Sequence, residues 1–159
     1  REGAFTDEVI RKGVEEMRWQ GRMETVLPGV IIDGAHNEAG VEEFVKTARR
    51  LEADYPVTLL FAAVGDKDYR HMIETICREL RLERVIVTEV GGYRSVDVKV
   101  PEELFRQFGA KKVTAIPDVE EAFDEALREQ GDGILFCVGS LYLVGNIKSI
   151  LETRRSAHD

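Results

Sequence analysis

The stretch Gly29-Val30-Ile31-Ile32-Asp33-Gly34-Ala35-His36-Asn37 decides how this chain folds. It has the pattern of a short apolar strand that ends at an aspartate and turns at a glycine. A histidine and an asparagine then lie at the start of a predicted helix. Ionisable side chains at the carboxyl end of a buried strand are typical of ligand sites in open α/β sheets. We therefore expect a ligand site at this junction between strand and helix.

The same alternation of apolar strand and helix continues along the chain. The predicted strands are 30–33, 57–64, 84–88, 112–116 and 133–138. The predicted helices are 41–51, 72–80, 101–108, 119–127 and 143–151. The strands are continuous apolar runs, as expected of parallel strands that are covered on both faces. The alternation predicts right-handed crossovers and a mostly parallel sheet.

The two ends of the chain differ from this pattern. Residues 1–18 carry apolar side chains at helical spacing, which predicts a linker helix before the sheet. Residues 22–27 precede Pro28-Gly29 and are predicted to form an antiparallel strand at the sheet edge. We expect one domain over residues 19–153 and a polar, frayed tail over 154–159.

Composition and charge exclude several classes of protein. The chain has 159 residues, of which 43% are hydrophobic and 33% charged, as in one globular domain. Its net charge of -8 argues against nucleic acid as a partner, because that binding requires a basic patch. No apolar run is long enough to cross a bilayer, so no membrane partner is expected.

The cysteines and the first residue indicate the compartment and the extent of the chain. Cys77 and Cys137 both lie in apolar segments, so we predict buried free thiols in a reducing, cytoplasmic environment. The chain begins at Arg1 rather than at a methionine, and we expect it to be part of a longer protein.

Three polar loops follow predicted strands. The first carries Asp33 and His36, the second carries Lys67 within Gly65-Asp66-Lys67-Asp68, and the third carries Ser140 after Gly139. Because the carboxyl ends of parallel strands meet at one edge of a sheet, we expect these loops to lie together there. A lysine and the backbone N–H groups of a helix N-terminus both favour an anion.

Two arginines are further candidates for ligand contacts. Arg22 follows Trp19 and Gly21, an arrangement that lets a guanidinium approach a phosphate or a carboxylate. Arg94 lies in the loop after the third predicted strand. Either could instead be a solvated surface residue.

Each candidate also has an ordinary structural interpretation. Asn37, Asp68 and Ser140 could be helix N-caps, and Asp33 could cap the turn that follows it. His36 could be oriented by Asp33, or it could be a satisfied rim residue. We predict no metal site, because no third ligand is obvious near the Asp33 and His36 pair. The chain contains no P-loop, so it lacks the phosphate cradle of a phosphoryl-transfer site.

Five motifs together carry a resemblance to a known family. They are Trp19-Gln20-Gly21-Arg22, Asp33-Gly34-Ala35-His36-Asn37, Asp66-Lys67-Asp68, Arg94 with Pro101-Glu102-Glu103-Leu104, and Gly139-Ser140-Leu141-Tyr142-Leu143-Val144-Gly145. From about Trp19 to Leu151 the chain resembles the C-terminal domain of folylpolyglutamate synthase/dihydrofolate synthase, in the Mur ligase superfamily.

The resemblance implies a fold and a reaction. The fold would be a Rossmann-like, three-layer α/β/α domain with about six strands. The full-length enzymes are ATP-dependent amide ligases whose central domain uses a P-loop and Mg²⁺ to phosphorylate a carboxylate of dihydropteroate or folate. The amine of L-glutamate then attacks the acyl phosphate. This chain would work with its own N-terminal ATPase domain, as a monomer, and would have no ligase turnover when isolated.

The resemblance also assigns roles to single residues. Arg22 would contact the nucleotide phosphates and Asp33 the ribose, with Asn37 on the same nucleotide side. His36 would be the catalytic residue, near the γ-phosphate and the incoming glutamate. Ser140, Lys67 and Arg94 would bind substrate.

Two departures from the family pattern stand near these positions. Glu38-Ala39 replaces the usual proline after Asn37 and brings a negative charge close to the predicted site. The loop Gly91-Gly92-Tyr93-Arg94 replaces a common Asn-Pro-Arg, which leaves the role of Arg94 open.

Two other readings of the chain stay open at this point. It could be the related domain of a peptidoglycan-type Mur ligase, or a non-catalytic binding domain. The motifs around Arg22 and Ser140 favour the folate branch. The coding sequence upstream of Arg1 would separate these readings, because a ligase requires a P-loop there.

Overall fold

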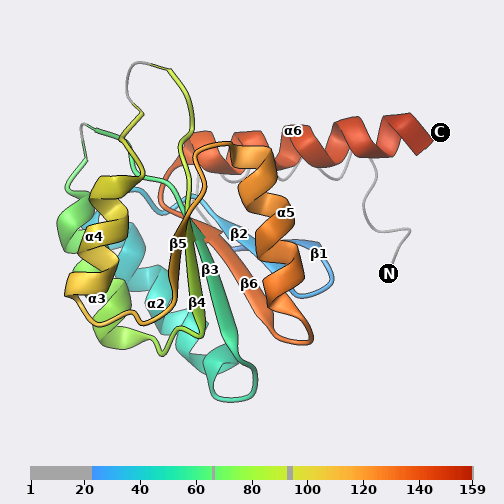
Figure 1. Ribbon diagram of the computed structural model, residues 1–159. Coiled ribbons are helices and arrows are strands. Elements are labelled where there is room, and N and C mark those ends of the chain that lie inside the picture. The colour runs from blue at the N-terminus through green and yellow to red at the C-terminus, as the bar shows by residue number, and fades with distance from the viewer. Residues whose placement is uncertain (1–22, 66, 93–94, 159) are drawn as a thin grey trace.

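The computed structural model describes residues 23–65, 67–92 and 95–158, which form one six-stranded sheet with helices on both faces (Figure 1). The strands are β1 (Glu24–Leu27), β2 (Val30–Asp33), β3 (Val57–Phe61), β4 (Arg84–Val87), β5 (Val113–Ala115) and β6 (Ile134–Val138). Their order across the sheet is β1-β2-β6-β3-β4-β5. Among the strands of the described residues, only β1 is antiparallel, to β2 at the edge, so the predicted mixed sheet and its antiparallel edge strand are confirmed.

The described residues contain five helices in two layers. They are α2 (Glu38–Glu52), α3 (Tyr69–Glu79), α4 (Lys99–Gln107), α5 (Val119–Gln130) and α6 (Leu141–His158). Apolar residues of α2, α3 and α4 pack on one face of the sheet, and those of α5 and α6 pack on the other. The predicted three-layer α/β/α architecture is therefore confirmed.

Alternate residues of each central strand supply the two cores. Leu59 and Phe61 of β3 point into the core under α2, α3 and α4, whereas Leu60 between them points into the core under α5 and α6. Aromatic edge-to-face contacts join helices to strands in the first core, with ring centroids 5.1 Å apart for Phe44 and Phe136. Burial on both faces explains why the strands are continuous apolar runs.

The path of the chain through the sheet creates a topological switch point beside β6. The chain first runs outward through β3, β4 and β5 with α2, α3 and α4 on one face. α5 then returns it across the other face, and β6 inserts between β2 and β3. The loop after β6 therefore leaves toward the opposite face from the loops after β2 and β3. Crevices at such points are where open α/β sheets bind ligands.

The register brings the ends of the three central strands to one level. Asp33 at the end of β2 pairs with Val138 at the end of β6. Phe61 at the end of β3 pairs with the same Val138. The loops that follow these strands consequently start side by side.

A buried ion pair fastens the edge strand to the last helix. The Lys148 side chain of α6 is almost fully buried, and its Nζ donates to Glu24 Oε1 of β1 at 2.6 Å. Because a buried ammonium requires a partner, this contact helps to fix α6 against the antiparallel edge. No helix in the described part of the chain is long and apolar enough to span a membrane.

The tail prediction was wrong. Residues 154–158 continue α6 instead of fraying. Arg154 lies 2.9 Å from Glu120 and 3.0 Å from Asp124, both on α5. These interhelical ion pairs hold the last turns of α6, although their residues are polar. The predicted helix over residues 1–18 lies outside the described residues.

Smaller differences concern element ends and one thiol. The second predicted strand stops at Phe61, and Val64 instead forms an isolated bridge to Ser95. α4 begins at Lys99, two residues before the proline that was expected to open it. Both cysteines are free, but Cys77 is half-buried rather than buried, because it faces a surface pocket.

Candidate functional site at the carboxyl edge of the sheet

Asp33 ends β2 with a buried carboxyl group. Only 3% of the residue is exposed, and Asp33 Oδ1 accepts a hydrogen bond from Ala35 N at 2.8 Å. Burial raises the pKa of Asp33 to about 7, and the backbone hydrogen bond opposes this shift only in part. The carboxyl group therefore changes charge near neutral pH and can accept hydrogen bonds from a ligand's hydroxyl groups.

His36 is oriented by the backbone rather than by Asp33. Its Nδ1 lies 2.9 Å from Gly34 O, and since a carbonyl oxygen only accepts, Nδ1 must donate. The neutral ring then presents Nε2 as an acceptor. The interpretation in which Asp33 orients His36 is replaced, because the Asp33 carboxylate binds Ala35 and the His36 ring binds Gly34.

Asn37 and Glu38 complete the start of α2. Asn37 Oδ1 accepts from Gly40 N at 2.8 Å, so the N-cap interpretation is confirmed and a nucleotide role for Asn37 stays a prediction. Glu38 Oε2 accepts from Thr75 Oγ1 of α3 at 3.0 Å, and Glu38 Oε1 is buried with no hydrogen-bond partner among the described residues. The charge that replaces the usual proline therefore faces α3.

The β6–α6 junction combines a glycine of positive φ with a buried serine. Gly139 has a φ of 127°, and a Cβ there would lie 2.5 Å from Ala62 O. Ser140 is buried, and its Oγ accepts from Leu143 N at 3.0 Å, which confirms the predicted N-cap. The hydroxyl hydrogen of Ser140 is still available for a ligand, because the cap uses the oxygen only as an acceptor.

A small pocket joins the three loops after β2, β3 and β6. It has a volume of about 210 Å³ and is lined by His36, Val64, Lys67, Ser140, Leu141 and Tyr142. The predicted gathering of His36, Lys67 and Ser140 at one sheet edge is therefore confirmed. Lys67 is exposed and lies in a turn closed by a hydrogen bond from Lys67 N to Val64 O at 3.1 Å.

The pocket combines groups of different chemistry. His36 offers a nitrogen acceptor, Lys67 a positive charge and Ser140 a hydroxyl beside a helix N-terminus. A carboxylate or a phosphate suits the last two groups. The neighbouring Asp68 caps α3 and accepts from His71, so its charge is already engaged.

Tyr142 is a site residue that the sequence reasoning did not select. It lines the pocket while 54% of it is exposed, which makes it the most exposed large apolar side chain of the described residues. Its position one residue after the α6 start could have indicated this, because the first turn of α6 follows the same strand end as Ser140. Arg22 and Arg94, the two predicted arginine contacts, lie outside the described residues.

No cluster suited to a metal ion occurs among the residues that the structure describes. No three His, Cys, Asp or Glu side chains there come close enough together to bind one. A divalent ion at this edge would need ligands from elsewhere, such as phosphate oxygens or another domain.

Comparison with protein families decides the relationship. The family described as Mur ligase, glutamate ligase domain matches residues 21–141, most of the chain. The chain belongs to this family. Its sheet edge with His36, Lys67 and Ser140 is thus an edge of a Mur ligase C-terminal domain.

Individual relatives place this Mur ligase domain beside the folate enzymes. It is 30% identical to the dihydrofolate synthase/folylpolyglutamate synthase of Bacillus subtilis, over 93% of this chain and 34% of that protein. It is 26% identical to the folylpolyglutamate synthase of Lacticaseibacillus casei, over 94% of this chain and 34% of that protein. The chain thus spans about a third of the length of these relatives.

Solved structures share the fold of the domain. Escherichia coli FolC in complex with ADP superposes with a TM-score of 0.73 at 22% identity, covering 86% of this chain and 32% of that chain. A bifunctional folylpolyglutamate synthase/dihydrofolate synthase with Mn, AMPPNP and L-glutamate bound gives a TM-score of 0.70 at 20% identity, covering 92% of this chain and 35% of that chain.

Proposed function

We propose that this domain supplies the C-terminal half of the ATP and glutamate site in an ATP-dependent amide ligase of the folylpolyglutamate synthase type. The observation that carries the proposal is the pocket that brings His36, Lys67 and Ser140 together at the switch point beside β6. The relationship to folate ligases, one solved with a nucleotide and L-glutamate bound, supplies the reaction class.

On the nucleotide side, the proposal rests on Asp33. Asp33 Oδ1 is engaged with Ala35 N, and among the described residues no other hydrogen bond to this carboxyl group is formed, so Oδ2 is available. An acidic side chain at the end of a strand suits the hydroxyl groups of a ribose. As the family resemblance implies, the ligand on this side would be ATP, and Arg22 and Asn37 would also contact it.

On the glutamate side, the proposal uses Lys67 and Ser140. The Lys67 ammonium is exposed at the pocket, and Ser140 stands at the α6 N-terminus, where the helix dipole favours a negative charge. Both groups suit the carboxylates of L-glutamate. In the family resemblance Arg94 would join them as a third substrate contact.

His36 is the proposed catalytic residue. Because Nδ1 donates to Gly34 O, the ring is held with Nε2 directed away from that carbonyl, free to accept a proton or a hydrogen bond. His36 lines the same pocket as Lys67, so it would be near the amine of a bound glutamate. Removal of a proton from that amine prepares it to attack an acyl group.

The remaining chemistry requires parts beyond these residues. A P-loop and Mg²⁺ would supply phosphate binding and neutralise charge during phosphoryl transfer. The described residues offer neither a P-loop nor a cluster of metal ligands, so an ATPase domain would hold most of the Mg²⁺ shell. Dihydropteroate or folate would be the second substrate. The full-length protein would act as a monomer in the cytoplasm.

The proposal can be tested in a hybrid ligase. Residues 21–158 would replace the equivalent third of the Bacillus subtilis relative, and glutamate addition to tetrahydrofolate would be measured. We expect His36→Ala to lower kcat by about 10²-fold, the usual loss for a general base. Lys67→Ala should instead raise the KM for glutamate by about tenfold, through loss of one charge-assisted contact.

A matched control separates these effects from general damage. Lys46→Ala removes an exposed lysine on the outer face of α2 and should leave both constants unchanged. A hybrid that keeps full activity with both His36→Ala and Lys67→Ala would contradict the proposal.

A further inference from the structure

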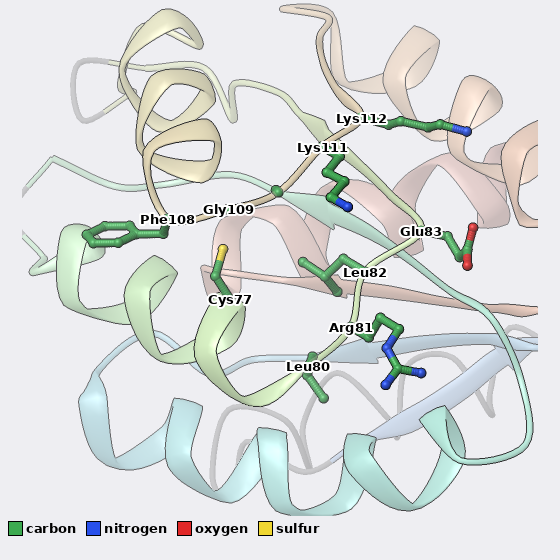
Figure 2. A pocket seen from close by; sticks show the side chains of 10 residues that line it. Cys77, Leu80, Arg81, Leu82, Glu83, Phe108, Gly109, Lys111 and Lys112 are labelled. Carbon is green, nitrogen blue, oxygen red and sulfur yellow. The ribbon is translucent and has the colours of Figure 1, made fainter.

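A second, larger pocket lies at the opposite edge of the sheet. It has a volume of about 350 Å³ and is formed by the loop before β4 and the loop before β5, together with the end of α3 (Figure 2). Since β4 has four residues, this amino edge lies at least about 13 Å from the site at the carboxyl edge. The volume is within the range of small-molecule sites.

The rim of this pocket is positively charged. It carries Arg81, Lys111 and Lys112 and a single carboxylate, Glu83, in a chain whose net charge is -8. None of the three cationic side chains forms a hydrogen bond or an ion pair with the residues that the structure describes. Three unpaired cations around one concavity favour an anionic ligand.

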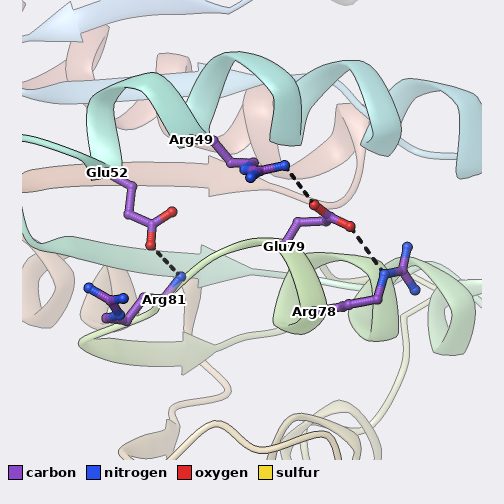
Figure 3. A network of polar contacts seen from close by, with 5 residues as sticks. All are labelled: Arg49, Glu52, Arg78, Glu79 and Arg81. Carbon is purple, nitrogen blue, oxygen red and sulfur yellow. Dashed lines mark hydrogen bonds and ion pairs between the residues drawn. The ribbon is translucent and has the colours of Figure 1, made fainter.

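Nearby acidic groups are already engaged, as Figure 3 shows. Glu79 accepts from Arg49 and from Arg78, at 3.1 Å in both cases. Glu52 Oε2 accepts from the backbone Arg81 N at 2.9 Å, which fixes the loop while leaving the Arg81 guanidinium free. The remaining acidic neighbour, Asp54, lies in an adjoining pocket that shares Arg81 and Glu83.

The base of the pocket is apolar. Leu82 and Cys77 lie at its centre in Figure 2, and Lys111 extends toward them from the loop after α4. Phe108 lies at the end of the pocket with its ring directed away from Leu82 and Cys77, and the guanidinium of Arg70 lies 5.2 Å from the ring centroid. An apolar base beneath a cationic rim suits a ligand with a flat apolar body and an anionic group.

We infer that this amino-edge pocket binds a small amphipathic anion, with its apolar body on Leu82 and Cys77 and its carboxylate or phosphate groups between Arg81 and Lys111. Folate glutamates and nucleoside phosphates both have this chemistry. The site is separate from the carboxyl-edge pocket, so ligand binding there can be tested independently of the proposed ligase function.

Cys77 provides a direct reporter of occupancy. Its thiol is half-buried at the base of the pocket, whereas Cys137 of β6 is fully buried in the core under α5 and α6. A ligand above Leu82 would cover the Cys77 sulfur. Alkylation of Cys77 should therefore slow when the pocket is filled, and Cys137 should react only if the domain unfolds.

The test measures alkylation of Cys77 by iodoacetamide in the 159-residue chain, using mass spectrometry. One arm adds pteroyltriglutamate and the other adds ADP, which separates a carboxylate source from a phosphate source. We expect at least one ligand to slow the reaction in a saturable manner. The double variant Lys111→Gln, Lys112→Gln should raise the half-protecting concentration by about tenfold or more.

The control variant Lys46→Gln, Arg50→Gln removes the same charge from the exposed face of α2 and should leave the half-protecting concentration unchanged. Protection that is equal in the pocket variant and the control would place the ligand elsewhere and overturn the inference. Absence of protection by either ligand at millimolar concentration would overturn it as well.

Discussion

Gly139→Ala is expected to destabilise the domain by about 3 kcal/mol or more and to disrupt the candidate site. Gly139 has a φ of 127°, a backbone conformation that alanine rarely adopts. An added Cβ would lie 2.5 Å from Ala62 O and 3.1 Å from two ring atoms of Phe61. Neither neighbour can retreat easily, because both belong to the central strand region and are fully buried.

The functional consequence follows from the position of the glycine. Gly139 joins β6 to Ser140, the N-cap of α6, so a shift of its backbone moves the serine hydroxyl and the start of the helix. We therefore expect loss of ligand binding at the carboxyl edge as well as loss of stability.

Urea unfolding of the purified chain would measure the effect. Gly145→Ala is the matched control, since Gly145 lies in α6 and no heavy atom of the described residues comes within 4 Å of an added Cβ. Alanine there should stabilise the helix by about 0.5–1 kcal/mol. An unchanged unfolding midpoint for Gly139→Ala would show that the strand-to-helix turn is not constrained as described.

Asp33→Asn is expected to stabilise the domain above neutral pH while weakening nucleotide binding. Burial raises the pKa of Asp33 to about 7, so the folded state disfavours the charged carboxylate. The group's contribution to stability is therefore highest below the pKa of the unfolded chain and is lost as pH rises through about 7. Asparagine keeps an acceptor for Ala35 N but has no charge to bury.

Unfolding free energies of both proteins at pH 5 and pH 8 would test this. From pH 5 to pH 8 the wild type should lose about 2–3 kcal/mol relative to Asp33→Asn. The control Asp132→Asn lies in an exposed turn, and its unfolding free energy should change with pH as that of the wild type does. An equal change in unfolding free energy from pH 5 to pH 8 for Asp33→Asn and the wild type would contradict a buried carboxyl group that titrates near neutral pH.

The strands of the sheet could be predicted from the sequence because burial on both faces requires continuous apolar runs. Parallel strands such as 134–138 are apolar at every position, and each predicted run became a strand. The N-caps Asn37, Asp68 and Ser140 were also predictable, because capping depends on local backbone groups. Once the strands were placed, their loops had to meet at one edge.

Features that depend on tertiary contacts could not be predicted in this way. The last turns of α6 are polar, and the contacts of Arg154 with α5 that hold them are invisible in a local pattern. The hydrogen bond from His36 to Gly34 depends on the local turn geometry, which spacing alone leaves open. The amino-edge pocket combines Cys77 at the end of α3 with residues 80–83 and 108–112 of two loops that carry no motif.

We propose that the carboxyl edge around His36, Lys67 and Ser140 binds nucleotide and glutamate. The most direct test is a ¹H–¹⁵N NMR titration of the isotopically labelled chain with ADP and with L-glutamate. We expect saturable amide shifts concentrated at residues 34–37, 67 and 139–142. Shifts that are absent from these residues, or confined to the amino-edge pocket, would contradict it.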